Sequence, residues 1–465
     1  MYPSKIIKKN YTILRNIQVF IISFILLLLI FMVHSAFGQR NSPLDQTFSS
    51  TEEKQSIQEN SLKAKALDEF KKEHYTEAIH LLEKALTFCS NDAEIYFYLG
   101  WFNHYRAYDS RPLNGYNYSY SKKIFNYLDK AISLNPNYGD AKYFYGAECS
   151  GNAFLAMQNQ DAEQLKYFYD LAYKKGAYPD WLIEFGENIL NSCDKNAILF
   201  TGGNADFDIC TYLQLCQKFR TDITIIPIGN IDRPWYVQFL KRGLKACVKK
   251  VNINLTDQQI MDIHPYKWDT TTVNINVSEK DKRRFGLKPE HTLSWIVKPD
   301  LVSDRLQFKI MGETAKERRY LSPQRAILLQ IVEDNFSERP IYFSNFVTTA
   351  FWGGLNDFFQ NGGLVSKLLP IKTIGTDYEV NLSMLEKLLQ KENFQNYIHI
   401  KNTDIPRISK PICIGYCNAF LMVQNYWKED NLKKWIDCYK SKIQINFQPE
   451  IEQEVLNLLE SNINH

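Results

Sequence analysis

The pattern of apolar positions changes along the chain. An unbroken apolar run occupies residues 19–33, and a polar stretch follows it. From 56 to 192, apolar residues recur every three or four positions, which is typical of amphipathic helices. From 193 to 380, short apolar runs alternate with helical patterns, and Gly, Pro, Asn and Asp separate them. The pattern predicts an N-terminal segment (1–38), a linker (39–55), an all-α region (56–192), an α/β domain (193–380) and a C-terminal helical segment (381–465).

The all-α region contains an internal repeat. Leu82, Ala85 and Gly100 recur as Leu128, Ala131 and Gly146, and Ala66 precedes Gly100 by 34 residues. A 34-residue period with small residues at fixed places indicates tetratricopeptide-like helical repeats. A third pair is expected near 139–157 and 161–174, with a capping helix at 178–192. Such arrays usually bind protein segments, so we expect a protein partner here.

The α/β domain shows strand and helix patterns in alternation. Apolar runs at 197–201, 222–228 and 341–344 predict buried strands, and the segment 323–335 predicts an amphipathic helix. Further strands are expected at 272–277, 293–298 and 306–311. Strand-helix-strand spacing favours a parallel or mixed sheet in a Rossmann-like three-layer arrangement. Helices are expected at 383–392, 411–428, 431–442 and 449–462.

Polar residues follow the first two predicted strands. Ligands in such sheets bind outside the carboxyl ends of the strands. Neither GxGxxG nor the P-loop pattern occurs, and carboxylates near the first turn would repel a phosphate. A hydroxyl-rich ligand, a cation or no ligand is therefore favoured over a nucleotide, and plain helix capping and turn formation would explain the same residues without a ligand. The candidate ligand-binding residues are Asn204, Asp206, Asp208, Asp232, Arg233, Trp235 and Trp352.

The insertion in the second repeat is rich in tyrosine. Aromatic rings with interleaved hydrogen-bonding groups can stack on sugar rings or grip a peptide. The alternative is packing between helices. The candidate protein-binding residues are Tyr105, Tyr108, Tyr116 and Tyr118.

One resemblance is specific. The run AILFTGGNADFDICTYLQ, then FRTDITIIPIGNIDRPWYVQFLKRG, and then RPIYFS resembles the soluble C-terminal region of bacterial protein O-mannosyltransferase-like membrane proteins. It covers roughly residues 180–370. Where that family carries N-G-D-N-D, this chain keeps only Asp206 in place. The transferase portion needs many membrane spans, and this chain has one apolar run at most. The resemblance therefore implies the accessory soluble domain without the transferase machinery.

The N-terminus predicts export. A basic segment, the apolar run and small residues at Ala36 and Gly38 form a secretory signal, and an uncleaved single membrane anchor is the alternative. Either would place the rest in the periplasm. Removing residues 1–38 leaves 51 basic against 52 acidic residues, which gives no electrostatic case for nucleic acid.

Metal and catalytic motifs are missing from the sequence. The nine cysteines form no CxxC, and the histidines show no zinc spacing, so neither a metal site nor a cofactor is expected. We expect an exported envelope binding or adaptor module, with a protein partner on the repeats and a glycan on the α/β domain. The alternative is an accessory subunit of a membrane glycosyltransferase, or a glycan-acting enzyme related to protein O-mannosylation.

Overall fold

The computed structural model describes residues 52–109, 116–244, 247–300, 319–390, 393, 395–396 and 406–424. The apolar run 19–33, the expected strand 306–311 and the expected helices 431–442 and 449–462 lie outside these ranges. Among the described residues, no helix has both the length and the apolar character needed to cross a bilayer.

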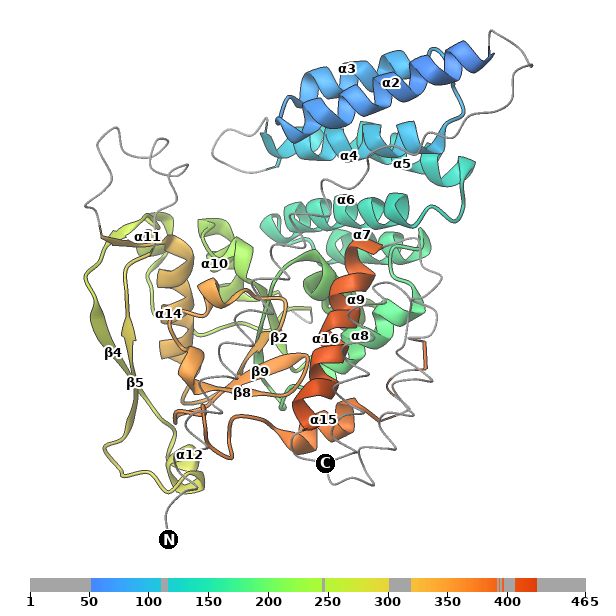
Figure 1. The fold of residues 1–465 in the computed structure, drawn as a ribbon. Helices are drawn as coiled ribbons and strands as arrows, with labels where there is room; N and C mark the ends of the chain where they lie inside the picture. The colour runs from blue at the N-terminus through green and yellow to red at the C-terminus, as the bar shows by residue number, and fades with distance from the viewer. Residues whose placement is uncertain are drawn as a thin grey trace. The chain divides into compact units, whose positions relative to one another are not determined.

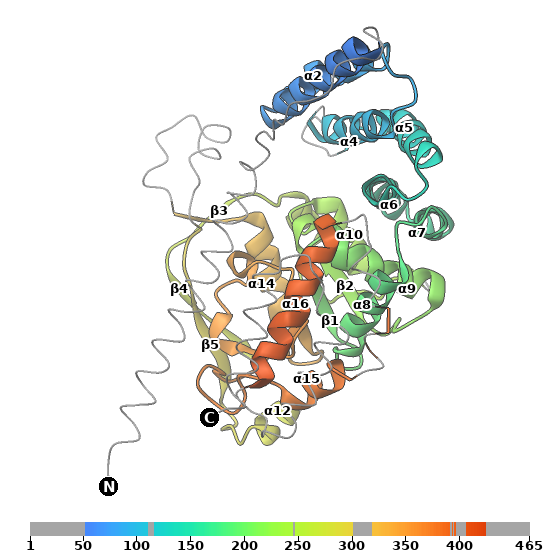
Figure 2. The same cartoon turned by 45° about the vertical axis from the view of Figure 1, so that its right-hand side comes forward.

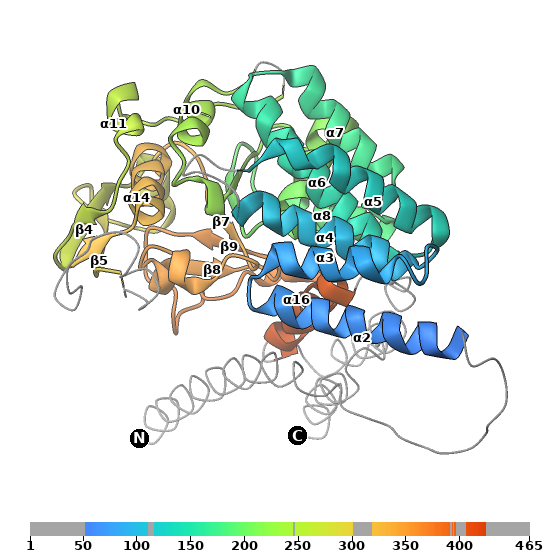
Figure 3. The same cartoon turned by 90° about the horizontal axis from the view of Figure 1, so that it is seen from above.

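The N-terminal half consists of stacked antiparallel helix pairs (Figure 1). They are α2 (Glu52–Lys71) with α3 (Tyr75–Ala85), α4 (Ala93–Asp109) with α5 (Ser121–Leu134), and α6 (Gly139–Gln158) with α7 (Ala162–Lys174). The viewpoint of Figure 3 shows these helices running side by side. Close approach explains the repeated small residues: a Cβ on Gly100 would lie 2.6 Å from a methyl carbon of Leu128. The predicted helical region is confirmed, while its tetratricopeptide assignment stays a prediction.

A five-stranded mixed sheet forms the centre of the α/β part. Its strands are β1 (Ile198–Thr201), β2 (Thr224–Pro227), β7 (Ile341–Ser344), β8 (Phe359–Asn361) and β9 (Val365–Leu368), in the order β2-β1-β7-β9-β8. The first three strands are parallel, and β9 and β8 extend the sheet in antiparallel fashion. All residues of β1, β2 and β7 are buried, as expected for parallel strands covered on both faces.

Helices cover both faces of the sheet, as Figures 1 and 2 show. On one side lie α8 (Asp180–Asn191), α9 (Ile209–Gln217) and α16 (Pro406–Gln424), and on the other lie α10 (Pro234–Arg242) and α14 (Pro323–Asn335). The predicted fold class, α/β with an N-terminal helical region and C-terminal helices, is confirmed. The chain leaves β1 for β2 on one side and returns to β7 on the other, so β1 and β7 flank a topological switch point.

Smaller elements complete the described chain. An antiparallel ribbon of β4 (Thr271–Asn276) and β5 (Thr292–Val297) accounts for two predicted strands, each displaced by one residue. The remaining elements are α11 (Asp257–Met261), α12 (Glu279–Arg284), α15 (Leu382–Leu388), and the short pair β3 (Tyr266–Lys267) and β6 (Tyr320–Leu321). One large apolar core runs from Phe97 through the sheet to Val423, and a smaller core joins α2, α3 and α4. The helix pairs α4–α7 therefore share their core with the sheet.

Candidate functional site

Asp206 lies at the switch point and is fully buried. It belongs to a π-helical turn, η2 (Asn204–Asp208), that follows β1. Its carboxylate accepts hydrogen bonds from the backbone N–H groups of Gly202 at 2.8 Å, Gly203 at 3.0 Å and Phe207 at 3.0 Å. Burial raises the pKa of Asp206, although the N–H groups of Gly202 and Gly203 and the Ser344 hydroxyl oppose the rise. The carboxylate thus holds its own turn together.

The loops that leave β1 and β7 pack tightly against each other. A Cβ on Gly202 would lie only 2.3 Å from the carbonyl oxygen of Phe346. A side chain at position 202 would therefore collide with the backbone of the loop after β7. Asp206 is thus enclosed at the switch point, while Gly202 beside it is exposed and the space around Gly203 is open.

Asp208, two residues further on, points to the helical pairs instead. The Ser150 hydroxyl on α6 donates to its carboxylate at 2.6 Å, and the Tyr169 hydroxyl on α7 donates at 3.2 Å. Burial raises the pKa of Asp208 to about 7, with the two hydroxyls opposing the rise and the Asp206 charge adding to it. Asp208 therefore links the turn after β1 to the α6/α7 pair.

A second buried polar cluster lies between α4 and α6. The Nδ1 atom of His104 lies 2.8 Å from a carboxylate oxygen of Glu148, and the hydroxyl of Tyr116 donates to the same oxygen. Asn152 donates to the other oxygen at 3.2 Å. Burial disfavours the ionised form, yet the hydrogen bonds and the charge of His104 hold the pKa of Glu148 below its usual value. Since a carboxylate only accepts, Nδ1 of His104 carries the proton.

Aromatic side chains of both regions meet beside these clusters. We define the junction surface as Tyr108, Tyr118, Phe154, Arg233 and Trp235, all half-buried. The Phe154 ring of α6 lies 6.3 Å from the ring of Trp235 on α10. The positive charge of Arg233 acts on Tyr118, whose pKa burial raises to about 12 while Arg233 opposes the rise. The ring contact of Phe154 with Trp235 therefore joins α6 of the helical region to α10 after β2.

The tyrosine cluster is continuous with this surface. The ring of Tyr116 lies 4.7 Å from that of Tyr108 and 5.2 Å from that of Tyr118. Tyr105, by contrast, is 39% exposed and contacts Phe70 of α2, at 5.3 Å between ring centres. Three of the four predicted tyrosines thus lie together, and Tyr105 belongs to the surface shared by α2 and α4.

The other predicted site residues are dispersed. Trp352 packs on Phe359 of β8 at 4.7 Å, and its indole N–H donates to the carbonyl of Val347 at 3.1 Å. Asp232 is half-buried beside Arg233, and Asn204 begins η2. Of the predicted ligand residues, Arg233 and Trp235 are the two on the junction surface.

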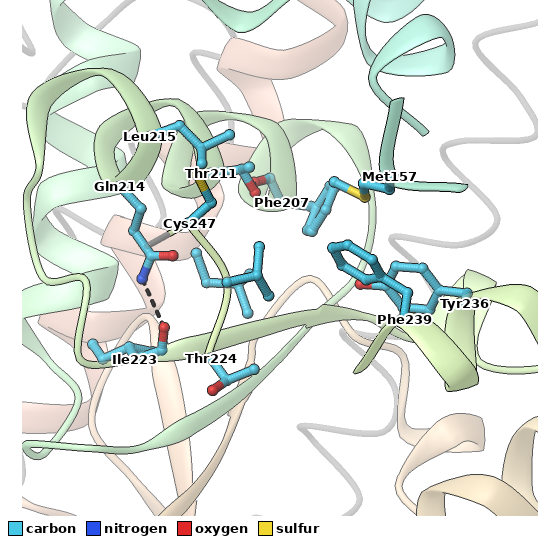
Figure 4. A pocket seen from close by; sticks show the side chains of 12 residues that line it. Met157, Phe207, Thr211, Gln214, Leu215, Ile223, Thr224, Tyr236, Phe239 and Cys247 are labelled. Carbon is cyan, nitrogen blue, oxygen red and sulfur yellow. Dashed lines mark hydrogen bonds between the residues drawn. The ribbon is translucent and has the colours of Figure 1, made fainter. Parts of the chain in front are cut away.

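A small cavity lies between α9, β2 and α10. Figure 4 shows Met157, Phe207, Tyr236 and Phe239 around it, with the Gln214 side chain donating to the carbonyl of Ile223 at 2.8 Å. Its volume is about 20 Å³, comparable with the roughly 10–15 Å³ that one water needs. This cavity has no room for a sugar.

Sequence reasoning did not select His104, Glu148, Ser150 or Tyr169. A signal existed for Glu148, because it is an acidic residue at a position of α6 surrounded by small and aromatic residues. Its partner His104 lies 44 positions earlier, and no local pattern connects the two. Within the described ranges, no group of three or more His, Cys, Asp or Glu side chains is arranged to hold a metal ion.

The comparisons with known proteins give one match. Residues 182–309 and 295–385 match the family model of the TMEM260-associated domain 2. The match extends from α8 to α15 and leaves the helix pairs α2–α7 outside it. No curated protein and no solved structure matches the chain.

Proposed function

We propose that this protein is an exported binding module of the cell envelope, which holds a glycan at the junction surface and a protein partner on its helix pairs. One observation carries the glycan assignment. The ring of Phe154 from the helical region lies 6.3 Å from that of Trp235, in the first turn of the helix that follows β2. Export rests on the basic and apolar N-terminal segment.

The chemistry of the junction surface suits a sugar. Half-buried aromatic faces offer apolar area to the C–H groups of a pyranose, and their neighbours supply hydrogen-bond donors. Phe154 is held from beneath by Phe207, whose ring stacks with it at 5.8 Å and an interplanar angle of 7°. Support of this kind fixes the ring in one orientation before a ligand arrives, which lowers the entropy lost on binding.

The helix pairs supply the protein-binding part of the proposal. Trp101 and Tyr105 of α4 are partly exposed, and both contact Phe70 of α2. Their positions on α4 differ by four residues, so their side chains lie on one helix face. Stacked helix pairs offer such faces as extended binding surfaces.

An accessory role to a membrane glycosyltransferase is the second candidate. The match of residues 182–385 to the TMEM260-associated domain 2, a domain linked to an O-mannosyltransferase-like family, favours it. In that role the junction surface would hold the glycan while the helix pairs contact the transferase. Copurification of a glycosyltransferase with the full chain, and its loss with Tyr105→Asp, would support this candidate over a free-standing adaptor.

The glycan site is tested by titrating manno-oligosaccharides into the protein by calorimetry. Trp235→Ala is expected to weaken binding about tenfold, because it removes one stacking face. Tyr167→Ala is the matched control, because Tyr167 on α7 is 53% exposed and lies outside the junction surface. Thermal unfolding shows whether each variant is folded. Equal affinities for the wild type and a folded Trp235→Ala variant would contradict the proposed site.

A further inference from the structure

One face of α4 carries an acidic residue at one end and aromatic residues along the rest. Its members follow one another at spacings of four, three and four positions, so their side chains lie on one side of the helix: Glu94, Tyr98, Trp101 and Tyr105. The ring of Trp101 lies 6.0 Å from that of Tyr98 and 6.3 Å from that of Tyr105. The Tyr98 hydroxyl donates to the Glu94 carboxylate at 3.0 Å. We call these four residues the α4 stripe.

The aromatic part of the α4 stripe is partly exposed and is held in place from one side. Tyr105 is 39% exposed, and Tyr98 and Trp101 are half-buried. The ring of Phe70 on α2 lies 5.0 Å from that of Trp101 and 5.3 Å from that of Tyr105. Because these rings already pack on one another, a large apolar side chain of a partner would bury aromatic area here at a small cost in side-chain entropy.

The other end of the α4 stripe carries more negative than positive charge. The ammonium group of Lys63 on α2 lies 3.5 Å from a carboxylate oxygen of Glu59. It also lies 2.9 Å from an oxygen of Asp92 and 3.0 Å from an oxygen of Glu94. One ammonium group thus faces three carboxylates, which leaves an excess of two negative charges. Glu94 is the most accessible of the three, since its side chain is 45% exposed.

The excess of negative charge acts on Glu59. Burial raises the pKa of Glu59, the neighbouring carboxylate of Asp92 adds to the rise, and Lys63 opposes it only in part. A cationic side chain that reached the cluster from a partner would relieve this repulsion. Such a side chain would contact Glu94, because Glu94 is accessible and lies on the α4 stripe.

The length of the α4 stripe sets the spacing of the groups that could bind it. Glu94 and Tyr105 are 11 positions apart, which corresponds to about 16 Å of helix. An extended chain advances about 3.3 Å per residue, so about five residues cover the same distance.

We propose that the α4 stripe binds an extended protein segment in which a lysine or arginine pairs with Glu94 and a large apolar side chain, about five residues away, packs on Tyr105 beside Phe70. The proposal rests on the proposed protein-binding function of the helix pairs. It adds the charge of the partner segment and the spacing of its two contact residues.

The test selects peptides from a random dodecapeptide library displayed on phage, with the full chain as the target. We expect the selected peptides to carry Lys or Arg about four to six residues from a Trp, Phe or Leu. A synthetic consensus peptide, measured by calorimetry, should bind Tyr105→Ala about tenfold more weakly than the wild type, because one packing surface is lost. It should bind Glu94→Gln about threefold more weakly, because the ion pair is partly exposed.

The peptide is also changed, so that the charge is tested without altering the protein. Replacing its basic residue by Gln should weaken binding to the wild type by the same factor as Glu94→Gln. The two changes together should cost no more than either alone, because both remove the same interaction.

Two variants serve as controls. Glu77→Gln changes the charge equally at an exposed position in the first turn of α3, and Tyr167→Ala removes a ring that is 53% exposed on α7. Both should leave the peptide affinity unchanged, and thermal unfolding shows whether each variant is folded. A consensus peptide that binds through Tyr105 without a basic residue, or additive effects of the two charge removals, would overturn the basic segment and leave the protein-binding surface standing. A selection without a consensus, or a consensus peptide that binds a folded Tyr105→Ala variant as tightly as the wild type, would overturn both proposals.

Discussion

Two buried carboxyl groups, one on α6 and one that contacts α6, have pKa values that are shifted in opposite directions. Glu148 projects from α6 towards α4, and Asp208 reaches α6 from the turn after β1. Both are almost inaccessible to water. The pKa of Glu148 lies below its usual value, whereas burial raises that of Asp208 to about 7.

The difference lies in the partners. Burial disfavours both carboxylates, but Glu148 faces the imidazole of His104, whose charge and N–H bond favour ionisation. Asp208 faces only the hydroxyls of Ser150 and Tyr169 and feels the nearby charge of Asp206. The neutral hydroxyl donors offset only part of the cost of burying the charge, so the pKa of Asp208 remains raised. The imidazole beside Glu148 therefore accounts for the opposite directions in which the pKa values of these two carboxyl groups move.

The two groups shift stability with pH in opposite directions. A lowered pKa in the folded state, as for Glu148, contributes stability above the unfolded value that is lost as the pH falls through the folded pKa. A raised pKa, as for Asp208, contributes stability below the unfolded value near 4 that is lost as the pH rises towards about 7. At neutral pH, Glu148 therefore stabilises the folded state, and Asp208 destabilises it.

Removing the imidazole should have the largest effect. His104→Leu leaves Glu148 buried without its main partner, and we expect a loss of about 3 kcal/mol in the free energy of unfolding. Urea denaturation at pH 7 measures the loss. His80→Leu on the exposed face of α3 is the control and should change little. Combining His104→Leu with Glu148→Met should recover part of the loss, and a double variant no better than the single one would speak against the pair.

Neutralising Asp208 should alter the pH profile. Between pH 5 and 8 the wild type should lose about 2–3 kcal/mol more unfolding free energy than Asp208→Asn, because the amide does not titrate. The two proteins should be most alike below about pH 4, where Asp208 is protonated in both the folded and the unfolded chain. Denaturation series at the two pH values give the comparison, with Asp377→Asn on an exposed loop as control. Parallel profiles for Asp208→Asn and the wild type would refute the assignment.

Removing one of the hydroxyl groups that donate to Asp208 should have the smallest effect. Ser150→Ala deletes the 2.6 Å hydrogen bond, and we expect a cost of about 1 kcal/mol. Since the hydroxyl favours the ionised carboxylate, the cost should be greater at pH 8 than at pH 5. Ser133→Ala on the exposed face of α5 is the matched control, because the Ser133 hydroxyl donates a hydrogen bond only to the carbonyl of Lys130. An equal cost at both pH values would mean that Ser150 acts through packing alone.

Hydrogen bonding of buried charged groups also explains two residues in the sequence runs that carry the family resemblance. Asp206, in the turn after β1, is satisfied by backbone N–H groups at the carboxyl end of that strand. Arg339, from the RPIYFS run, is satisfied by backbone carbonyls at the amino ends of β1 and its neighbours. Each closes one end of the parallel sheet. Residues that draw attention in the sequence can thus serve the fold.

The sequence by itself determined the local elements. Apolar periodicity predicts α14, which runs from Pro323 to Asn335, and a short apolar run followed by Ser344 predicts β7. These signals are local, because helix and strand periods repeat within a few residues. The antiparallel edge formed by β9 and β8 was not anticipated, since pairing direction depends on how the chain returns to the sheet.

Only the tertiary structure decided which polar residues meet. His104 and Glu148 are 44 positions apart, and Ser150 and Asp208 are 58 apart. The sequence identifies each as polar, but the packing of α6 against α4 and the turn after β1 selects the partners. The same packing buries Asp206 and brings Phe154 to Trp235. Burial and long-range proximity set the charge state of these groups, and neither quantity is encoded within one stretch of chain.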